Sequence, residues 1–176
     1  MSNLDIKTLI TNEQIKKRTK ELGEQITKDY EGKDIHVICV LTGAIVFMTD
    51  LIKYIKNDKL TIDMMDVTSY GVEKRESTGH IKILKDLDAP IENRNVLIVE
   101  DIIDSGNTLK RLKDLLIKRN PKSIKCCTML DKPTRREQDI TPDYVGFTIE
   151  NVFVLGYGLD YDEYYRNLPY VGYVET

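Results

Sequence analysis

The residues with the clearest chemistry are three carboxylates followed by a short polar turn. Residues 96–99 form an apolar run, Glu100-Asp101 follow it directly, and Asp104 precedes the turn Ser105-Gly106-Asn107-Thr108. Carboxylates at the end of a buried strand can accept hydrogen bonds from sugar hydroxyls or hold a hard cation. Amides of a turn that opens a helix can hold a phosphate. The pattern predicts a site for a ribose 5-phosphate with a metal ion nearby.

A purely structural interpretation competes with this prediction. Asp104 or Ser105, taken alone, would be interpreted as the N-cap of the helix that follows, a common role for Asp and Ser. Glu100-Asp101 is harder to explain in that way, because burying two like charges together is costly without a ligand or cation. We therefore favour the binding site.

The elements that position these residues alternate between apolar strands and amphipathic helices. Thr11-Asn12-Glu13-Gln14 has the capping-box pattern, which predicts a helix that ends near Gly32. Further helices are expected over 45–55 and from the turn 101–107 to Asn120-Pro121. Strands are expected at 35–41, 60–67, 80–84, 96–99, 124–130, 144–149 and 152–155.

This alternation indicates an α/β fold with a mainly parallel sheet. Ligands of such sheets bind at the carboxyl ends of the strands. That rule directs attention to four segments: 41–43, 100–108, 130–132 and 155–160.

Composition excludes several other classes of protein. The chain has 176 residues, 41% of them hydrophobic and 31% charged, which is typical of one soluble domain, and we expect it to span 1–176. A net charge of -3 disfavours a nucleic-acid partner, and with no long apolar stretch we expect no membrane partner. Cys39, Cys126 and Cys127 form no Cys-x-x-Cys motif, so we expect buried thiols and a cytoplasmic location. With two histidines, His-based catalysis is hard to build.

The segment 96–109 resembles the phosphoribosyl-pyrophosphate motif of the type I phosphoribosyltransferases: apolar strand, two acids, two aliphatics, Asp, Ser or Thr, Gly, any residue, Thr. The rest of the chain, from about Thr11 to Val171, narrows the resemblance to the hypoxanthine-guanine phosphoribosyltransferases. The segments that narrow it are Leu41-Thr42-Gly43, Ser69-Tyr70-Gly71, Leu130-Asp131-Lys132-Pro133 and residues 153–161, together with Arg166.

The resemblance implies a fold and a reaction. The fold would be α/β of the type I phosphoribosyltransferase kind, with a mainly parallel central sheet flanked by helices, a small hood and a flexible lid loop. The reaction would transfer 5-phosphoribosyl from phosphoribosyl pyrophosphate (PRPP) to hypoxanthine or guanine, forming IMP or GMP and releasing pyrophosphate. The cofactor would be Mg2+, and the assembly a homodimer or homotetramer.

The resemblance also implies a role for each matching residue. Asp104 would be the general base at purine N7. Glu100 and Asp101 would bind the ribose hydroxyls and the metal, and Asp160 a second magnesium. The pyrophosphate would be bound by Thr42, Gly43 and Arg166, with a non-proline cis peptide before Thr42, and the 5-phosphate by Ser105, Gly106, Asn107 and Thr108.

For the purine, the resemblance assigns Lys132 to the 6-oxo group and Ile102 with Phe153 to the two faces of the ring. The Val154 backbone and Asp160 would lie near position 2. A lid from Ser69 through Tyr70 to Gly79 would close over the site during the reaction. The chain departs from many members at Thr42, where they have Lys, which loses a direct cationic contact. It also has Ser105 and Asn107 where several members have Thr and Lys.

Other interpretations remain open from the sequence. A regulatory relative that binds RNA or DNA would need a basic face, of which the net charge gives no sign, and xanthine or a pyrimidine could replace hypoxanthine and guanine. Lys132 alone would be a surface lysine and Phe153 alone a core residue. Gly156-x-Gly158 is no dinucleotide motif, because Tyr161 stands where the third glycine should be. His36 lies inside an expected strand and is interpreted as a core histidine with its hydrogen bonds satisfied. His80 receives no role.

Overall fold

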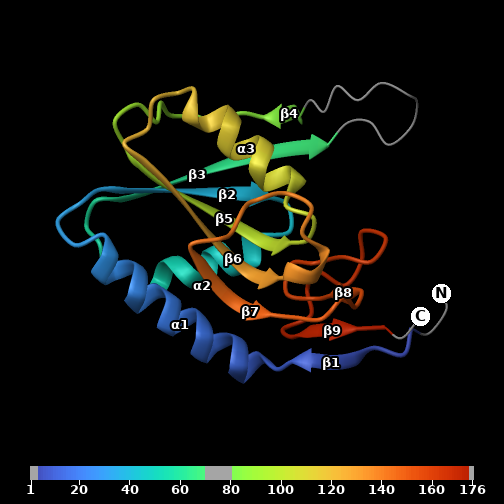
Figure 1. Cartoon of the computed structure of the whole chain (residues 1–176). Helices are drawn as coiled ribbons and strands as arrows, with labels where there is room; N and C mark the ends of the chain where they lie inside the picture. The colour runs from blue at the N-terminus through green and yellow to red at the C-terminus, as the bar shows by residue number, and fades with distance from the viewer. Residues whose placement is uncertain (1–3, 70–80, 175–176) are drawn as a thin grey trace, which may run out of the picture.

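The computed structural model of the protein describes residues 4–69 and 81–174. Within these ranges six strands form one sheet in the order β4-β3-β2-β5-β6-β7 (Figure 1). The strands are β2 (Ile35–Leu41), β3 (Leu60–Ser69), β4 (Ile81–Lys85), β5 (Asn95–Ile103), β6 (Ser123–Asp131) and β7 (Tyr144–Thr148). All neighbours pair in parallel except β4, which runs antiparallel to β3. The predicted mainly parallel sheet is confirmed.

Helices cover both faces of this sheet, which is why successive residues of its central strands, such as Val37 to Val40, are apolar. Helices α1 (Asn12–Asp29) and α2 (Ile45–Leu51), the latter continued by a 3-10 turn at Ile52–Tyr54, lie on one face, and α3 (Asn107–Ile117) lies on the other (Figure 1). Val37 and Cys39 of β2 pack into the core on the first side, whereas Ile38 and Val40 pack into the core on the second. A strand buried on both faces cannot carry polar side chains in alternation.

Helix α1 begins as the sequence predicts. The Gln14 amide donates to the Thr11 hydroxyl at 3.2 Å, and the Thr11 amide donates to the Gln14 side chain at 2.8 Å, which completes the capping box. Further along, Arg18 donates to the carbonyls of Gly146 and Val145 at 3.0 and 2.8 Å. The helix thereby covers groups of the edge strand β7 that would otherwise be available to another chain.

A second sheet joins the two ends of the described chain. It has the order β1-β9-β8 within the described ranges and is antiparallel throughout, with β1 at Lys7–Ile10, β9 at Val171–Tyr173 and β8 at Val154–Leu155. These strands lie beside the carboxyl-terminal end of the main sheet, in the position of the expected hood (Figure 1). Strands β1 and β9 were not predicted and β8 was predicted too long, because strands of two to four residues leave little periodicity to detect.

Strand β5 corrects the expected turn at 101–107. It extends through the acidic pair to Ile103, because Ile102 and Ile103 pair with Leu130 and Asp131 of β6, so that only residues 104–106 form the turn. A 3-10 turn at Pro133–Arg135 follows β6. Strand β3 reaches Ser69, and the rest of the expected lid, including Tyr70, lies outside the described residues, as does His80.

Three minor expectations can be checked directly. All three cysteines are buried and free, as predicted. His36 is a buried histidine, as predicted, although only its Nδ1 atom, 2.8 Å from the Thr61 hydroxyl, has a hydrogen-bond partner. Among the described elements no helix follows the Gly156-x-Gly158 segment.

Of the helices in residues 4–69 and 81–174, none is both long and apolar enough to span a membrane.

Candidate active site

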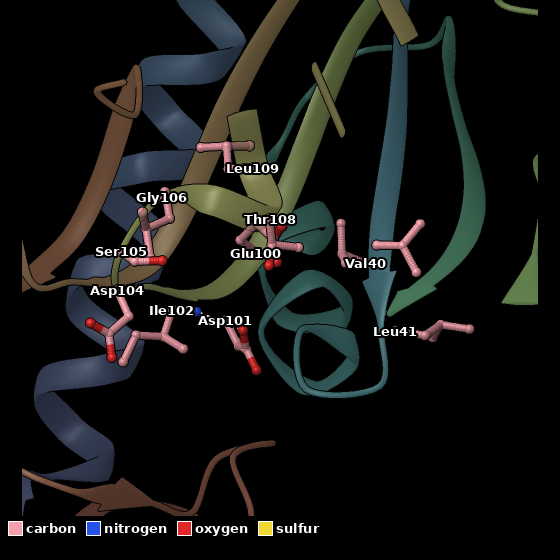
Figure 2. Close-up of a pocket in the computed structure, with 12 residues that line it drawn as sticks. Val40, Leu41, Glu100, Asp101, Ile102, Asp104, Ser105, Gly106, Thr108 and Leu109 are labelled. Carbon is pink, nitrogen blue, oxygen red and sulfur yellow. Dashed lines mark hydrogen bonds between the residues drawn. The ribbon is translucent and has the colours of Figure 1, made fainter. Parts of the chain in front are cut away.

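The carboxyl ends of β2 and β5 border a cavity of about 240 Å³. Figure 2 shows Asp104 and Ser105 at the turn that follows β5, with Val40 and Leu41 of β2 across the cavity. The lining residues are Val40, Leu41, Val67, Thr108, Leu109 and the continuous run Glu100 to Gly106. The cavity therefore lies where the topology of an open α/β sheet places a ligand.

Glu100 and Asp101 carry an electrostatic cost at this position. Glu100 is only 6% exposed, and burial raises its pKa well above the ordinary range, with the neighbouring Asp101 charge adding to the rise. Burial also raises the pKa of Asp101, to about 6, although its carboxylate accepts a hydrogen bond from the Ile102 amide at 2.7 Å and the Arg166 charge opposes the rise. Carboxylates held in this way favour a cation or hydroxyl donors as ligands.

Two glycines allow the surrounding loops to approach the acidic pair closely. A Cβ atom on Gly43 would overlap the Asp101 carboxylate, and one on Gly158, whose φ is +99°, would overlap the Gly43 carbonyl. The peptide bond before Thr42 is cis, as the resemblance implied, and Thr42 itself is exposed at the rim. The structure thus brings the expected pyrophosphate loop next to the expected metal site.

The turn after β5 leads into α3, whose N-cap residue itself supplies no side-chain hydrogen bond. Gly106, in the left-handed region with a φ of +82°, is the N-cap of α3, and it makes no side-chain cap hydrogen bond. Neither Asp104 nor Ser105 occupies the N-cap position, so the capping interpretation was wrong for Asp104, whereas the Ser105 hydroxyl does accept a hydrogen bond from the Asn107 amide at 3.3 Å. With its first amide engaged in this way, the start of α3 offers an anion the amides that follow and the field of the helix.

Asp104 is half-buried and stands at the start of this turn. Its carboxylate accepts a hydrogen bond from Nε of Arg135 at 3.0 Å, and its carbonyl accepts one from Arg136 at 3.0 Å. The Asn107 side chain is engaged by Glu137 and Gln138, so any phosphate contact from Asn107 would use its backbone N–H. Residues 135–138 received no role from the sequence, because an Arg-Arg-Glu-Gln run has no motif or periodicity that predicts its contacts.

Lys132 and Phe153 differ in exposure from what their residue types suggest, since the lysine is buried and the phenylalanine is exposed. Lys132 is only 6% exposed, its ammonium donates to the Val152 carbonyl at 2.7 Å, and burial lowers its pKa. Phe153 is 46% exposed, with the Tyr161 ring edge-on at 5.5 Å between centroids. The surface interpretation of Lys132 and the core interpretation of Phe153 were therefore both wrong. A buried cation and an exposed ring at strand ends suit a flat polar ligand.

Asp160 and Arg166 form an ion pair with each other. Nη2 of Arg166 lies 2.9 Å from Oδ1 of Asp160, while Nη1 donates to the Gly158 carbonyl at 2.8 Å and the Glu163 amide donates to Asp160. The loop that carries them has positive φ at several non-glycine residues: Tyr157, Asp162, Glu163 and Tyr165. Such conformations persist only where the surrounding contacts fix them, and they are common at functional sites.

Comparison with known proteins supports this site. The phosphoribosyl transferase domain family matches residues 5–162. A hypoxanthine-guanine phosphoribosyltransferase of Bacillus subtilis (strain 168) is 53% identical over 166 residues, covering 94% of this chain and 91% of that protein. The chain belongs to the phosphoribosyltransferase family.

A relative of known structure and a longer relative agree with this family membership. The crystal structure of a hypoxanthine phosphoribosyltransferase from Staphylococcus aureus matches with a TM-score of 0.92 at 50% identity, covering 98% of this chain and 92% of that one. The chain also matches the bifunctional protein TilS/HprT of Listeria monocytogenes serotype 4b, at 52% identity over 94% of this chain, and it spans 25% of that relative's length. The predicted phosphoribosyltransferase fold is confirmed.

The buried acidic pair of this phosphoribosyltransferase gives a prediction about stability. The pKa of Asp101 is about 6 in the folded protein against an ordinary 3.8, so the folded state binds the proton more tightly than the unfolded state. Stability is therefore lost as the pH rises between these two values. We expect Asp101→Asn to increase the free energy of unfolding at pH 8 by about 1 to 3 kcal/mol and to change it much less at pH 4.

Urea denaturation at both pH values measures this difference. Glu31→Gln is a matched control, because it removes an exposed carboxylate far from the cavity and should leave stability unchanged. A destabilised Asp101→Asn protein at pH 8, or an equal gain at both pH values, would show that this carboxylate is not held at an electrostatic cost.

Proposed function

We propose that the protein transfers 5-phosphoribosyl from PRPP to hypoxanthine or guanine, forming IMP or GMP and pyrophosphate, as a cytoplasmic enzyme of purine salvage. The observation that carries the proposal is the run from Glu100 to Thr108, in which a buried acidic pair, Asp104 and the start of α3 share one cavity. Lys132 leaves β6 next to this run, and its amide donates to the Ile103 carbonyl at 3.0 Å. The similarity to the hypoxanthine-guanine and hypoxanthine phosphoribosyltransferases of B. subtilis and S. aureus supports the substrate class.

Mg2+ is the cofactor that suits these residues. Glu100 and Asp101 are the carboxylates proposed to hold one ion and Asp160 a second, and oxygen donors are what this cation prefers. Within the described ranges no group of three or more metal-binding side chains converges. Mg2+ is commonly held by one or two carboxylates together with substrate phosphates and water, which agrees with this donor set. When bound, it would supply positive charge to offset the negative charge of the pyrophosphate.

The ribose phosphate would be held mainly by backbone groups. The turn Ser105 to Thr108 offers amides and two hydroxyls to the 5-phosphate, in the favourable field of the α3 N-terminus. Thr42 and Gly43 would bind the pyrophosphate through their backbone, and Arg166 would bind it as a cation. Asp104 would accept or share the proton at purine N7 as the bond to C1 of the ribose forms.

Lys132 is proposed to select the purine. Its ammonium has donors and no acceptor, so it can bind a 6-oxo group but not a 6-amino group. The ammonium donates to the Val152 carbonyl at 2.7 Å, and this bond, which orients the donor without any ligand, supports the proposal. Phe153 and Ile102 would contact the two faces of the ring, while the Val154 backbone and Asp160 would lie near position 2.

Some expectations stay predictions. They include the lid that begins at Ser69 and Tyr70, the single domain over 1–176, and the homodimer or homotetramer. The absence of nucleic-acid and membrane partners is another.

The substrate proposal predicts an order of activity among purines. With Mg2+ and PRPP, hypoxanthine and guanine should both be converted, while adenine should give no detectable product, because a buried donor left facing an amino group can cost about 10,000-fold. Xanthine should be a poor third substrate, since its 2-oxo group would face the Val154 carbonyl and the Asp160 carboxylate. Activity should be lost on chelation and return with Mg2+.

The assay is initial-rate formation of nucleotide and pyrophosphate with each purine in turn. A kcat/KM for xanthine at or above that for hypoxanthine would overturn the assignment of Val154 and Asp160. Conversion of adenine would overturn the role of Lys132, and full activity in chelator would refute the metal.

The role of Asp104 predicts the effect of one isosteric change. Asp104→Asn keeps the shape of the side chain and removes the proton acceptor, so we expect kcat to fall about 100-fold or more with little change in GMP affinity. Asp114→Asn is a matched control on α3, where the carboxylate pairs with Lys110 at the surface. Single-turnover rates should be used, so that product release does not hide the chemical step. An unchanged single-turnover rate for Asp104→Asn would exclude it as the base.

A further inference from the structure

Residues 135–138 form an unassigned second layer behind the phosphate turn. They begin at Arg135, the last residue of the 3-10 turn that follows β6, and run along residues 104–107. The contacts between the two segments are Arg135 to the Asp104 carboxylate, Arg136 to the Asp104 carbonyl, the Glu137 and Gln138 amides to the Ser105 carbonyl, and the side chains of Glu137 and Gln138 to that of Asn107. By hydrogen bonds this layer reaches Asp104, Ser105 and Asn107, but not Gly106.

Gly106 is held by packing instead. A Cβ atom built on it would lie 2.8 Å from Ile140 and 3.0 Å from Arg136, so the layer leaves no room behind the turn. Ile140 in turn is buried in the core with Leu109 and Leu112 of α3. The turn is therefore fixed from behind, while its other side borders the cavity.

The Asn107 side chain has both of its polar groups satisfied within this layer. Its amide nitrogen donates to the Glu137 carboxylate at 2.8 Å, and its oxygen accepts from the Gln138 amide at 2.7 Å. Asn107 is also the first residue of α3, and its backbone N–H donates to the Ser105 hydroxyl at 3.3 Å, so these bonds together fix the conformation of the turn. An anion site built from backbone amides binds tightly only if the amides are already oriented.

The charge of Glu137 supports a role in positioning Asn107. An exposed carboxylate close to a phosphate site opposes phosphate binding through its charge. Its hydrogen bond to Asn107 is the one favourable contribution that the described contacts give it. Charge and hydrogen bonding therefore predict opposite effects when this side chain is changed.

We infer that Glu137 and Gln138 are positioning residues that hold Asn107, and through it orient the turn 104–107 for the 5-phosphate. The inference rests on the proposed function, in which this turn binds that phosphate. Neither residue touches the reacting atoms. Their contribution should therefore appear with ligands that carry the 5-phosphate and be absent with ligands that lack it.

Titration calorimetry with GMP and with guanosine tests this directly, because the two ligands differ only in the 5-phosphate. Gln138→Ala and Glu137→Ala should each weaken GMP binding about 3- to 10-fold, the size expected for one lost hydrogen bond, and leave guanosine binding within about 2-fold. Glu137→Gln keeps an acceptor for Asn107 without the charge, so it should bind GMP at least as well as the wild type. Asp114→Asn, the same charge change elsewhere on the surface, should alter neither ligand.

Unchanged GMP binding by Gln138→Ala, or an equal loss for guanosine, would overturn the inference. Tighter GMP binding by both Glu137→Ala and Glu137→Gln would also overturn it, because Glu137 would then act only through its charge. Should Gln138→Ala fail to fold, the two variants of the exposed Glu137 decide the question alone. Failure of the proposed function would be seen separately, as no IMP formation by the wild-type protein.

Discussion

The structure depends on two adjacent carboxylates held at the end of a buried strand. Strand β5 lies at the centre of the sheet, and its pairing with β6 continues past Glu100 and Asp101 to Ile103. Their charges are therefore fixed where water is scarce, and burial raises the pKa of both. Protein packing alone gives no reason for such an arrangement, whereas a cation or a sugar does. The close loops at Gly43 and Gly158 and the start of α3 are all arranged around this strand end.

Much of the fold could be predicted because local patterns agreed with the tertiary structure. The run at 35–41 became β2 with the same bounds, since six apolar residues around His36, followed by Thr-Gly, leave one consistent interpretation. The acidic pair misled the prediction of the turn. Glu100 and Asp101 looked like the end of a strand, but their backbone continues the hydrogen-bonded ladder whatever their side chains are. Strands β1 and β9 depend on pairing with each other across the whole chain, which no local pattern reveals.

The site could be predicted as a set of residues but not as a set of contacts. Resemblance to a family supplied Lys132 and Phe153, whereas their own residue types suggested a surface lysine and a core phenylalanine. The pairing of Asp160 with Arg166 and the layer behind the phosphate turn could not be foreseen. The contacts of residues 135–138 with 104–107 join segments about thirty positions apart in the chain, and their register follows from the pairing of β5 with β6.

The most direct test of the central claim is the number of protons released when PRPP and Mg2+ bind. Ligation by Asp101 requires its ionised form, and with a pKa of about 6 roughly half of the free sites are protonated at pH 6. Titration calorimetry in two buffers of different ionisation enthalpy gives the proton count. We predict that the wild type releases about half a proton more per site than Asp101→Asn at pH 6, and that this difference disappears at pH 8. Equal release by the two proteins at pH 6 would contradict the assignment of the buried acidic pair to ligand binding.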